Sequence, residues 1–191
     1  MTPLTRRKAL KMLVTTAGLT TVMPLVGESA EPEIHKVTGS DNMNLEIPDS
    51  LKAEHEELHE ELVRATKAGG KTGEAAAAVA KALHPHFVKE EQLAMPPLGL
   101  LRDLAAGRMP PNAEAVVKLS DNLKKDLPAM LKEHENIVVA LAALANAARQ
   151  ENKPAAQQFA EKLKQHAKTE EDVLYPAAIL VGEYIKLKLN R

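Results

Sequence analysis

The segment HFVKEEQLAMP, residues 86–96, is similar to the segment HAKTEEDVLYP, residues 166–176, at an offset of 80. A second pair of matching segments precedes these two, EHE at residues 54–56 and EHE at residues 133–135, at an offset of 79. Such an internal repeat indicates two helical hairpins of common design, each with one exposed apolar face. Two such hairpins bury those faces by packing together. The sequence therefore predicts an all-α protein, an antiparallel four-helix bundle.

The spacing of apolar residues supports four long helices. They are expected over residues 49–68, 74–95, 127–152 and from 154 onward. The last helix is expected to bury Val173 and to be kinked by Pro176. Residues 98–126 are too long for a bare turn, so they are expected to form an inserted connection that packs as a lid or a lead-in segment. Residues 49–191 are thus predicted to form one bundle domain.

The composition narrows the possible chemistry. Lys and Arg number 25 and Asp and Glu number 26, for a formal net charge of −1, and the chain has two Phe, two Tyr and no Trp. A nucleic-acid partner is excluded, because neither positive charge nor stacking aromatic groups are in excess. The chain has no Cys, which excludes disulfides, thiolate metal ligands and a Cys nucleophile. Any metal site must be built from His and carboxylate side chains.

The N-terminal segment has the features of an export signal. Paired arginines, Arg6 and Arg7, precede a weakly apolar stretch over residues 12–27, and this arrangement resembles a twin-arginine signal peptide. The resemblance implies export by the twin-arginine machinery, loss of residues 1–30, and a periplasmic or otherwise exported protein that often carries a cofactor. The stretch is shorter than the roughly 20 apolar residues that span a bilayer, so no stable membrane span is expected after signal removal. Residues 31–48 lack periodicity and are predicted to be a linker.

Four imidazoles and two carboxylates fall on the inward faces of the four predicted helices, because residues four apart on a helix share a face. They are His55, His86, Glu90, His134, His166 and Glu170. Six buried polar groups without partners would cost on the order of 6 to 18 kcal/mol, comparable with the whole stability of a domain. A metal would satisfy them. This set of ligands suits a pair of non-haem iron ions, with Mn or Zn as less specific alternatives and a purely structural polar network as the remaining one.

The same motifs resemble those of the hemerythrin-like, or HHE cation-binding, family. The EHE turns and the two HxxxEE segments, each followed by Pro, occur in the family's order over about residues 49–180. The resemblance implies an antiparallel four-helix bundle around two iron ions. It also implies that His55 and His86 bind one iron, that His134 and His166 bind the other, and that Glu90 and Glu170 bridge them.

One histidine departs from the pattern of the oxygen-carrying members of that family. Those members have a second His one turn after the ligand on the third helix, where this chain has Val138, whereas this chain has His59 one turn after His55. His59 is therefore either a seventh metal ligand or a residue that lines the pocket. Glu91 and Glu171 lie about 100° from the ligand face. They are expected to be solvated, or else to orient a ligand imidazole.

The other polar residues near these motifs are assigned ordinary roles. His84 is expected to point outward from the second helix, and Tyr175 and Met95 occupy matching positions that are expected to be core. The carboxylates around His55 are expected to form a solvated acidic face. These are Glu54, Glu56, Glu57, Glu60 and Glu61.

Three functions are compatible with a centre of this kind. The first is a protein of the cell envelope that binds O2 or another small diatomic such as NO, because a His-rich ligand set keeps iron reducible. The second is a di-iron enzyme that consumes peroxide or NO, for which Tyr175 is the only nearby phenol. The third is a periplasmic metal-handling protein. A binding, sensing or storage role is favoured over an enzyme, because no dedicated proton relay is evident.

Overall fold

The computed structural model describes residues 45–190, which form helices and short connections and contain no strand. The predicted signal, residues 1–30, and residues 31–44 of the predicted linker lie outside the described residues. The helices are α1 (Asp49–Lys67), α2 (Gly70–Leu93), α3 (Met95–Leu98), α4 (Leu101–Ala105), α5 (Ala113–Gln150), α6 (Pro154–Thr169), the π-helical segment η1 (Glu170–Leu174) and α7 (Tyr175–Leu189). Within this range no helix combines the length and the apolar character needed to cross a membrane.

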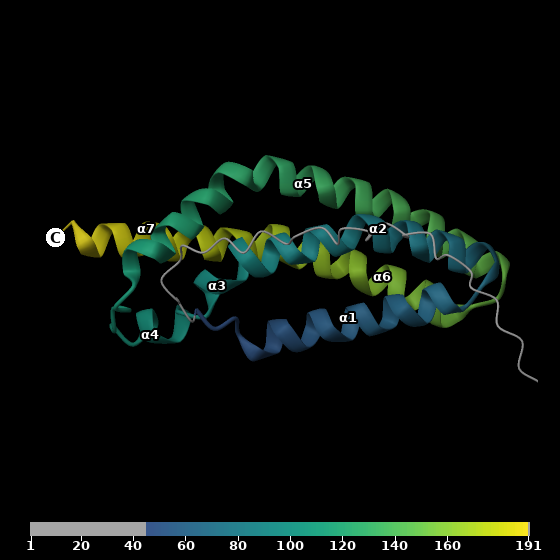
Figure 1. The fold of residues 1–191 in the computed structure, drawn as a ribbon, viewed down its shortest axis with the longest axis horizontal. Coiled ribbons are helices and arrows are strands. Elements are labelled where there is room, and N and C mark those ends of the chain that lie inside the picture. The colour runs from purple at the N-terminus through teal and green to yellow at the C-terminus, as the bar shows by residue number, and fades with distance from the viewer. Residues whose placement is uncertain (1–44, 191) are drawn as a thin grey trace, which may run out of the picture. The chain divides into compact units, whose positions relative to one another are not determined.

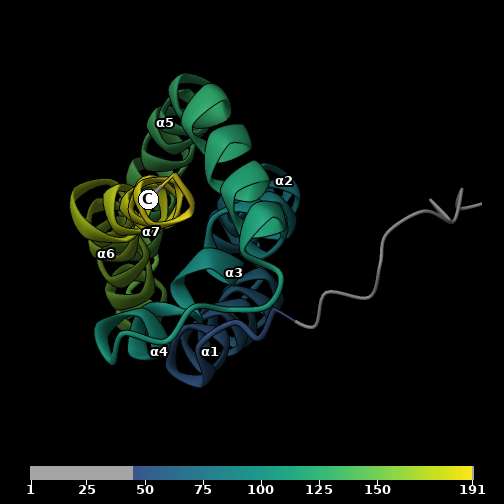
Figure 2. The same cartoon turned by 90° about the vertical axis from the view of Figure 1, so that its left-hand side faces the viewer.

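The long helices form two hairpins, α1 with α2 and α5 with α6 (Figure 1). In the view turned by 90°, α1 lies opposite α5, and α2 lies opposite α6 (Figure 2). The hairpins therefore meet through two interfaces, α2 against α5 and α1 against α6. The predicted all-α bundle of two hairpins is confirmed.

The two hairpin turns are tied together by the carboxylate of Glu151, which follows the end of α5. Oε1 of Glu151 accepts a hydrogen bond from the backbone N–H of Lys71 at 2.8 Å, and Oε2 accepts one from the backbone N–H of Thr72 at 3.1 Å. These are free N–H groups at the start of α2, where a negative charge is also favoured by the helix dipole. Gly69 and Gly70, with φ of 69° and 62°, make the left-handed turn that brings α2 to this position.

The third long helix starts earlier than predicted. α5 begins at Ala113 rather than near residue 127, so much of the expected insertion over residues 98–126 belongs to the helix. The reason is that its apolar spacing continues toward the N-terminus, where Val116 and Leu123 are fully buried. Ser120 adds a hydrogen bond of 2.8 Å to the carbonyl of Ala178 in α7.

A π-helical turn changes which residues face inward at the end of α6. The prediction placed Val173 in the core and a kink at Pro176, but η1 comes first, and Val173 is 55% exposed. A π-helical turn closes its hydrogen bond five residues along the chain instead of four. The residue that faces inward after Glu170 is therefore Tyr175, which is 1% exposed.

Candidate metal centre

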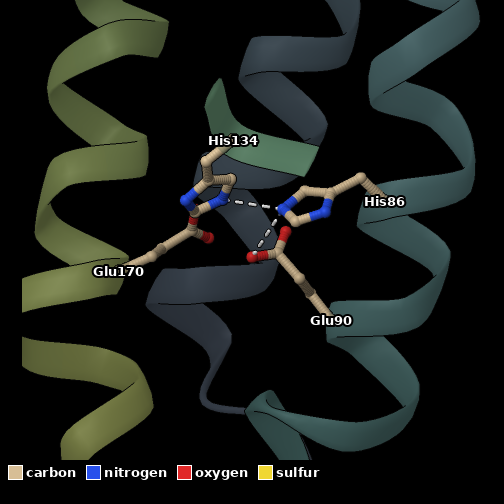
Figure 3. Close-up of side chains that lie close together, drawn as sticks. All are labelled: His86, Glu90, His134 and Glu170. Carbon is tan, nitrogen blue, oxygen red and sulfur yellow. Dashed lines mark hydrogen bonds and ion pairs between the residues drawn. The ribbon is translucent and has the colours of Figure 1, made fainter. Parts of the chain in front are cut away.

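The structure brings the six predicted centre residues together in the interior of the bundle. All are at most 5% exposed, and they come from α1, α2, α5, α6 and η1. They form two groups, His86 with Glu90, His134 and Glu170, and His55 with His166 and Glu170. Within each group the nitrogen or oxygen atoms that a metal would use lie within 4.8 Å of one another. Figure 3 shows the first group, in which side chains from three helical segments point toward one another.

The two carboxylates each face both groups. Oε1 of Glu170 lies 3.0 Å from Nε2 of His166 and 3.7 Å from Nε2 of His55, while its Oε2 lies 3.4 Å from Nε2 of His134. Glu90 is similar, because its Oε1 lies 3.4 Å from Nε2 of His86 and its Oε2 lies 3.8 Å from Nε2 of His55. Carboxylates placed in this way are suited to bridging two cations.

The imidazoles that lie closest to one another are not the two ligand pairs that the family resemblance implies, which are His55 with His86 and His134 with His166. In the structure, Nε2 of His86 lies 2.7 Å from Nε2 of His134, and the rings of His55 and His166 lie 5.3 Å apart. The reason is that α2 packs against α5 and α1 against α6, so the imidazoles meet across the interfaces between hairpins.

Each imidazole is held at its outer nitrogen by a carboxylate from a neighbouring helix. The Nδ1 contacts are His55 with Glu91 at 3.3 Å, His86 with Glu133 at 2.8 Å, His134 with Glu171 at 2.9 Å and His166 with Glu54 at 3.1 Å. An Nδ1–H that donates to a carboxylate leaves Nε2 as the free lone pair of the ring, directed at the centre. Such contacts also raise the basicity of a metal ligand.

These contacts correct two expectations from the sequence. Glu91 and Glu171 take the second of their two proposed roles, orienting an imidazole, although Glu91 is still 48% exposed. Glu54 was assigned to a solvated acidic face, but its carboxylate holds His166. Glu133 was given no role and holds His86, in a network that also includes Lys89. The repeat could have indicated the roles of these carboxylates, because Glu54 and Glu133 occupy equivalent positions in it, as do Glu91 and Glu171.

Four buried atoms of the centre have no hydrogen-bond partner. They are Nε2 of His55, Oε2 of Glu90, Nε2 of His166 and Oε1 of Glu170. A buried donor or acceptor left unpaired costs about 1 to 3 kcal/mol. Coordination to cations would satisfy all four, and the donor set of imidazole and carboxylate suits iron. The residues present therefore fit a metal centre.

The charges of the centre favour a cation in it. Burial and the charge of Glu170 raise the pKa of Glu90. Burial also acts to raise the pKa of Glu170, but the three imidazoles that lie close to its oxygens hold it well below its usual value. For His166, burial acts to lower the pKa, and the carboxylate of Glu170, 3.0 Å from Nε2, overcomes this effect and raises it to about 9. The two carboxylates therefore attract positive charge into the interior.

Tyr175 lies inside the centre. Its hydroxyl donates a hydrogen bond to Oε1 of Glu90 and lies 3.2 Å from Nε2 of His134 and 3.4 Å from Nε2 of His86. The sequence correctly indicated a buried residue but not this contact. A phenol on an inward helix face needs a polar partner, and that requirement was the available signal.

His59 lies outside both groups. Its side chain is exposed and lines a surface pocket between α1 and α2, together with His84. The buried stripe of α1 continues from His55 to Leu58 and Leu62. Three residues turn a helix by about 60° less than a full turn and four by about 40° more, so His59 lies on the opposite side of His55 from Leu58 and outside this stripe. The structure therefore places His59 in neither group, and the pocket that it lines is on the surface rather than at the centre. His84 points outward, as predicted.

Comparison with known proteins identifies one family. The family model described as Hemerythrin HHE cation binding domain matches residues 46–178. No curated protein and no solved structure matches the chain. The matched range includes all six centre residues, their four outer carboxylates and Tyr175.

Proposed function

Because the chain belongs to the hemerythrin HHE cation-binding family, we propose that its centre holds two iron ions and binds O2 or another small diatomic such as NO. The observation that carries this proposal is the pair of buried His and Glu groups that share Glu170. A bound iron pair would supply reversible electron exchange with O2 or direct coordination of NO. His55 and His166 would hold one ion, His86 and His134 the other, and Glu90 with Glu170 would bridge them.

The surroundings of the centre support a small uncharged ligand. On one side of the centre, Leu83, Phe87, Ile137 and Leu163 line a small cavity together with His86, His134 and His166. These apolar side chains are buried and keep water away from the imidazoles. A diatomic molecule is small and weakly polar, so such a lining accepts it more readily than an ionic substrate.

The proposed location is the cell envelope. Support comes from the paired arginines Arg6 and Arg7 and the apolar stretch that follows them, which resemble a twin-arginine signal. Export in the folded state would allow the metal to be loaded before the protein crosses the membrane. The export machinery is then a transient partner of the chain.

A second candidate function is supported by Tyr175. Its hydroxyl is a protonated group within hydrogen-bond distance of Glu90 and His134, and a proton donor at this place is useful to an enzyme that reduces peroxide or NO. We therefore keep a di-iron enzyme as the alternative to a binding protein.

Metal analysis combined with optical spectroscopy tests both functions. Protein purified from its native host should contain two iron ions per chain, and its spectrum after anaerobic reduction should change reversibly on addition of O2 or NO. One tightly bound Zn per chain, or no metal, would contradict the iron proposal. Continuous loss of added peroxide or NO under reducing conditions would favour the enzyme.

A further inference from the structure

Two surface pockets lie at equivalent places in the two repeats. The α1–α2 pocket has a volume of about 380 Å³, and six of its lining residues are His55, Glu56, His59, Glu60, His84 and Glu91. The α5–α6 pocket has a volume of about 310 Å³, and its lining includes Val138, Glu161, Lys164, Lys168 and Glu171. The offsets of the repeat place His59 opposite Val138, His84 opposite Lys164 and Glu91 opposite Glu171.

In each pocket, one lining carboxylate contacts an imidazole of the centre. In the α1–α2 pocket this contact joins Glu91 to Nδ1 of His55, and in the α5–α6 pocket it joins Glu171 to Nδ1 of His134. The first contact is longer, at 3.3 Å against 2.9 Å, and Glu91 is more exposed than Glu171, at 48% against 32%. His55 also lines its pocket directly. The α1–α2 pocket is therefore in more direct contact with the centre.

The chemistry of the two pockets differs. The α1–α2 pocket presents two exposed imidazoles and three carboxylates, and neither Lys nor Arg lines it. One of its carboxylates, Glu60, is already paired with Arg64 outside the pocket. The α5–α6 pocket has two lysines beside its two carboxylates, and one of them, Lys168, is paired with Asp172 outside the pocket. Across residues 45–190, every histidine belongs either to the centre or to the α1–α2 pocket.

We propose that the α1–α2 pocket is the uptake route for the divalent transition-metal ions of the centre. His59, His84 and the pocket carboxylates hold the ion transiently, and it passes inward beside His55 when Glu91 moves away from Nδ1. The ion exchanges ligands along this route and stays divalent. Exposed side chains bind such an ion weakly enough to release it to the buried groups. The inference rests on the proposed function only in requiring that the centre binds metal.

The rate of metal uptake tests this route. Metal-free full-length protein is mixed anaerobically with Fe²⁺, aliquots are quenched with excess chelator, and protein-bound iron is measured over time. His59→Ala combined with His84→Ala should load about tenfold more slowly than the unmodified protein, the smallest rate effect typical of a site that concentrates cations, because the carboxylates that remain lack the two imidazoles that hold the ion. His59→Val combined with His84→Lys gives this pocket the residues of its counterpart and should be slower still. Both variants should reach the final iron content of the unmodified protein.

The matched control is Lys164→Ala combined with Lys168→Ala in the α5–α6 pocket, which should load at the unmodified rate. Equal loading rates for the two histidine variants and the unmodified protein would overturn the route. A final content lowered by one ion in both histidine variants would also overturn it, because His59 or His84 would then be a ligand of the centre. Failure of the unmodified protein to take up Fe²⁺ would contradict the proposed function itself. If the unmodified protein loads fully and the histidine variants load at the same rate, only the route is overturned.

Discussion

The hydroxyl of Tyr175 donates a hydrogen bond to Oε1 of Glu90, so that a residue of the second repeat contacts a carboxylate of the first inside the centre. The equivalent of Tyr175 in the first repeat is Met95, which has no hydroxyl. The centre is therefore symmetric in its four imidazoles and their outer carboxylates, but not in this phenol. Burial and the charge of Glu90 raise the pKa of Tyr175, so the phenol stays protonated and remains a donor.

Replacing this phenol should destabilise the metal-free protein. Tyr175→Phe keeps the ring but deprives Glu90 of a buried hydrogen bond, and the expected loss is about 1 to 3 kcal/mol in the free energy of unfolding. Urea denaturation measures it. The control is Tyr184→Phe on the same helix, where the ring is 39% exposed and the change should stay within about 0.5 kcal/mol. Equal stability of Tyr175→Phe and the unmodified protein would mean that this hydrogen bond contributes nothing.

The two glutamates of each HxxxEE segment should respond differently to mutation. Glu170→Ala removes oxygens that face both groups, so both metal ions should be lost. Glu171→Ala removes only the partner of Nδ1 in His134, so the ion number should stay at two while the affinity falls by about 10- to 100-fold. Competition with a chelator measures both quantities, and Glu90→Ala with Glu91→Ala repeats the comparison in the first repeat. Retention of one ion by Glu170→Ala would show that it does not bridge.

The convergence of the six centre residues could be predicted because it depends on two features of the sequence, its helical periodicity and its internal repeat. Helical periodicity gives the direction in which each side chain points from its own helix axis. The repeat indicates that the two hairpins have the same structure. The spacing between His86 and Glu90, repeated at His166 and Glu170, is sufficient to direct these four side chains inward.

The details that the sequence did not reveal depend on the packing between helices. Periodicity does not say which neighbouring helix a side chain meets, so neither the short distance between His86 and His134 nor the contact between Glu54 and His166 could be predicted. The inward position of Tyr175 depends on the π-helical turn of η1, which helical periodicity does not include. His59 lies at the edge of the face that His55 occupies, on the side away from Leu58 and Leu62, and the side of His55 on which the buried stripe of α1 continues was not taken into account.

Acid should weaken the link between the two hairpin turns. Hydrogen bonds from Lys153, Thr72 and Lys71 lower the pKa of Glu151 from 4.5 to about 2. A carboxyl with a lowered pKa in the folded state stabilises the fold fully above its unfolded pKa, and this contribution is lost as the pH falls from about 4.5 to about 2. Glu151→Gln should therefore be less stable than the unmodified protein near neutral pH, and the difference should shrink in acid. Urea midpoints between about pH 7 and pH 2.5 measure this trend.

The control for this comparison is Glu161→Gln, which changes an exposed carboxylate of α6. Its difference from the unmodified protein should stay small and vary little over the same pH range. A stability difference for Glu151→Gln that is constant with pH would show that the charge of Glu151 does not stabilise the turns.

Removal of metal should lower the stability of the fold, because four buried atoms of the centre then have no partner. A ligand that binds only the folded state adds RT ln(1 + [L]/Kd), about 4 kcal/mol when its concentration is a thousand times Kd. The metal-loaded protein should therefore unfold at a clearly higher temperature than the chelated protein in a calorimetric scan. Glu170→Ala provides the control, since a centre that no longer holds metal should unfold at the same temperature with and without chelator. Equal midpoints for the loaded and chelated forms of the unmodified protein would contradict metal binding by these buried groups.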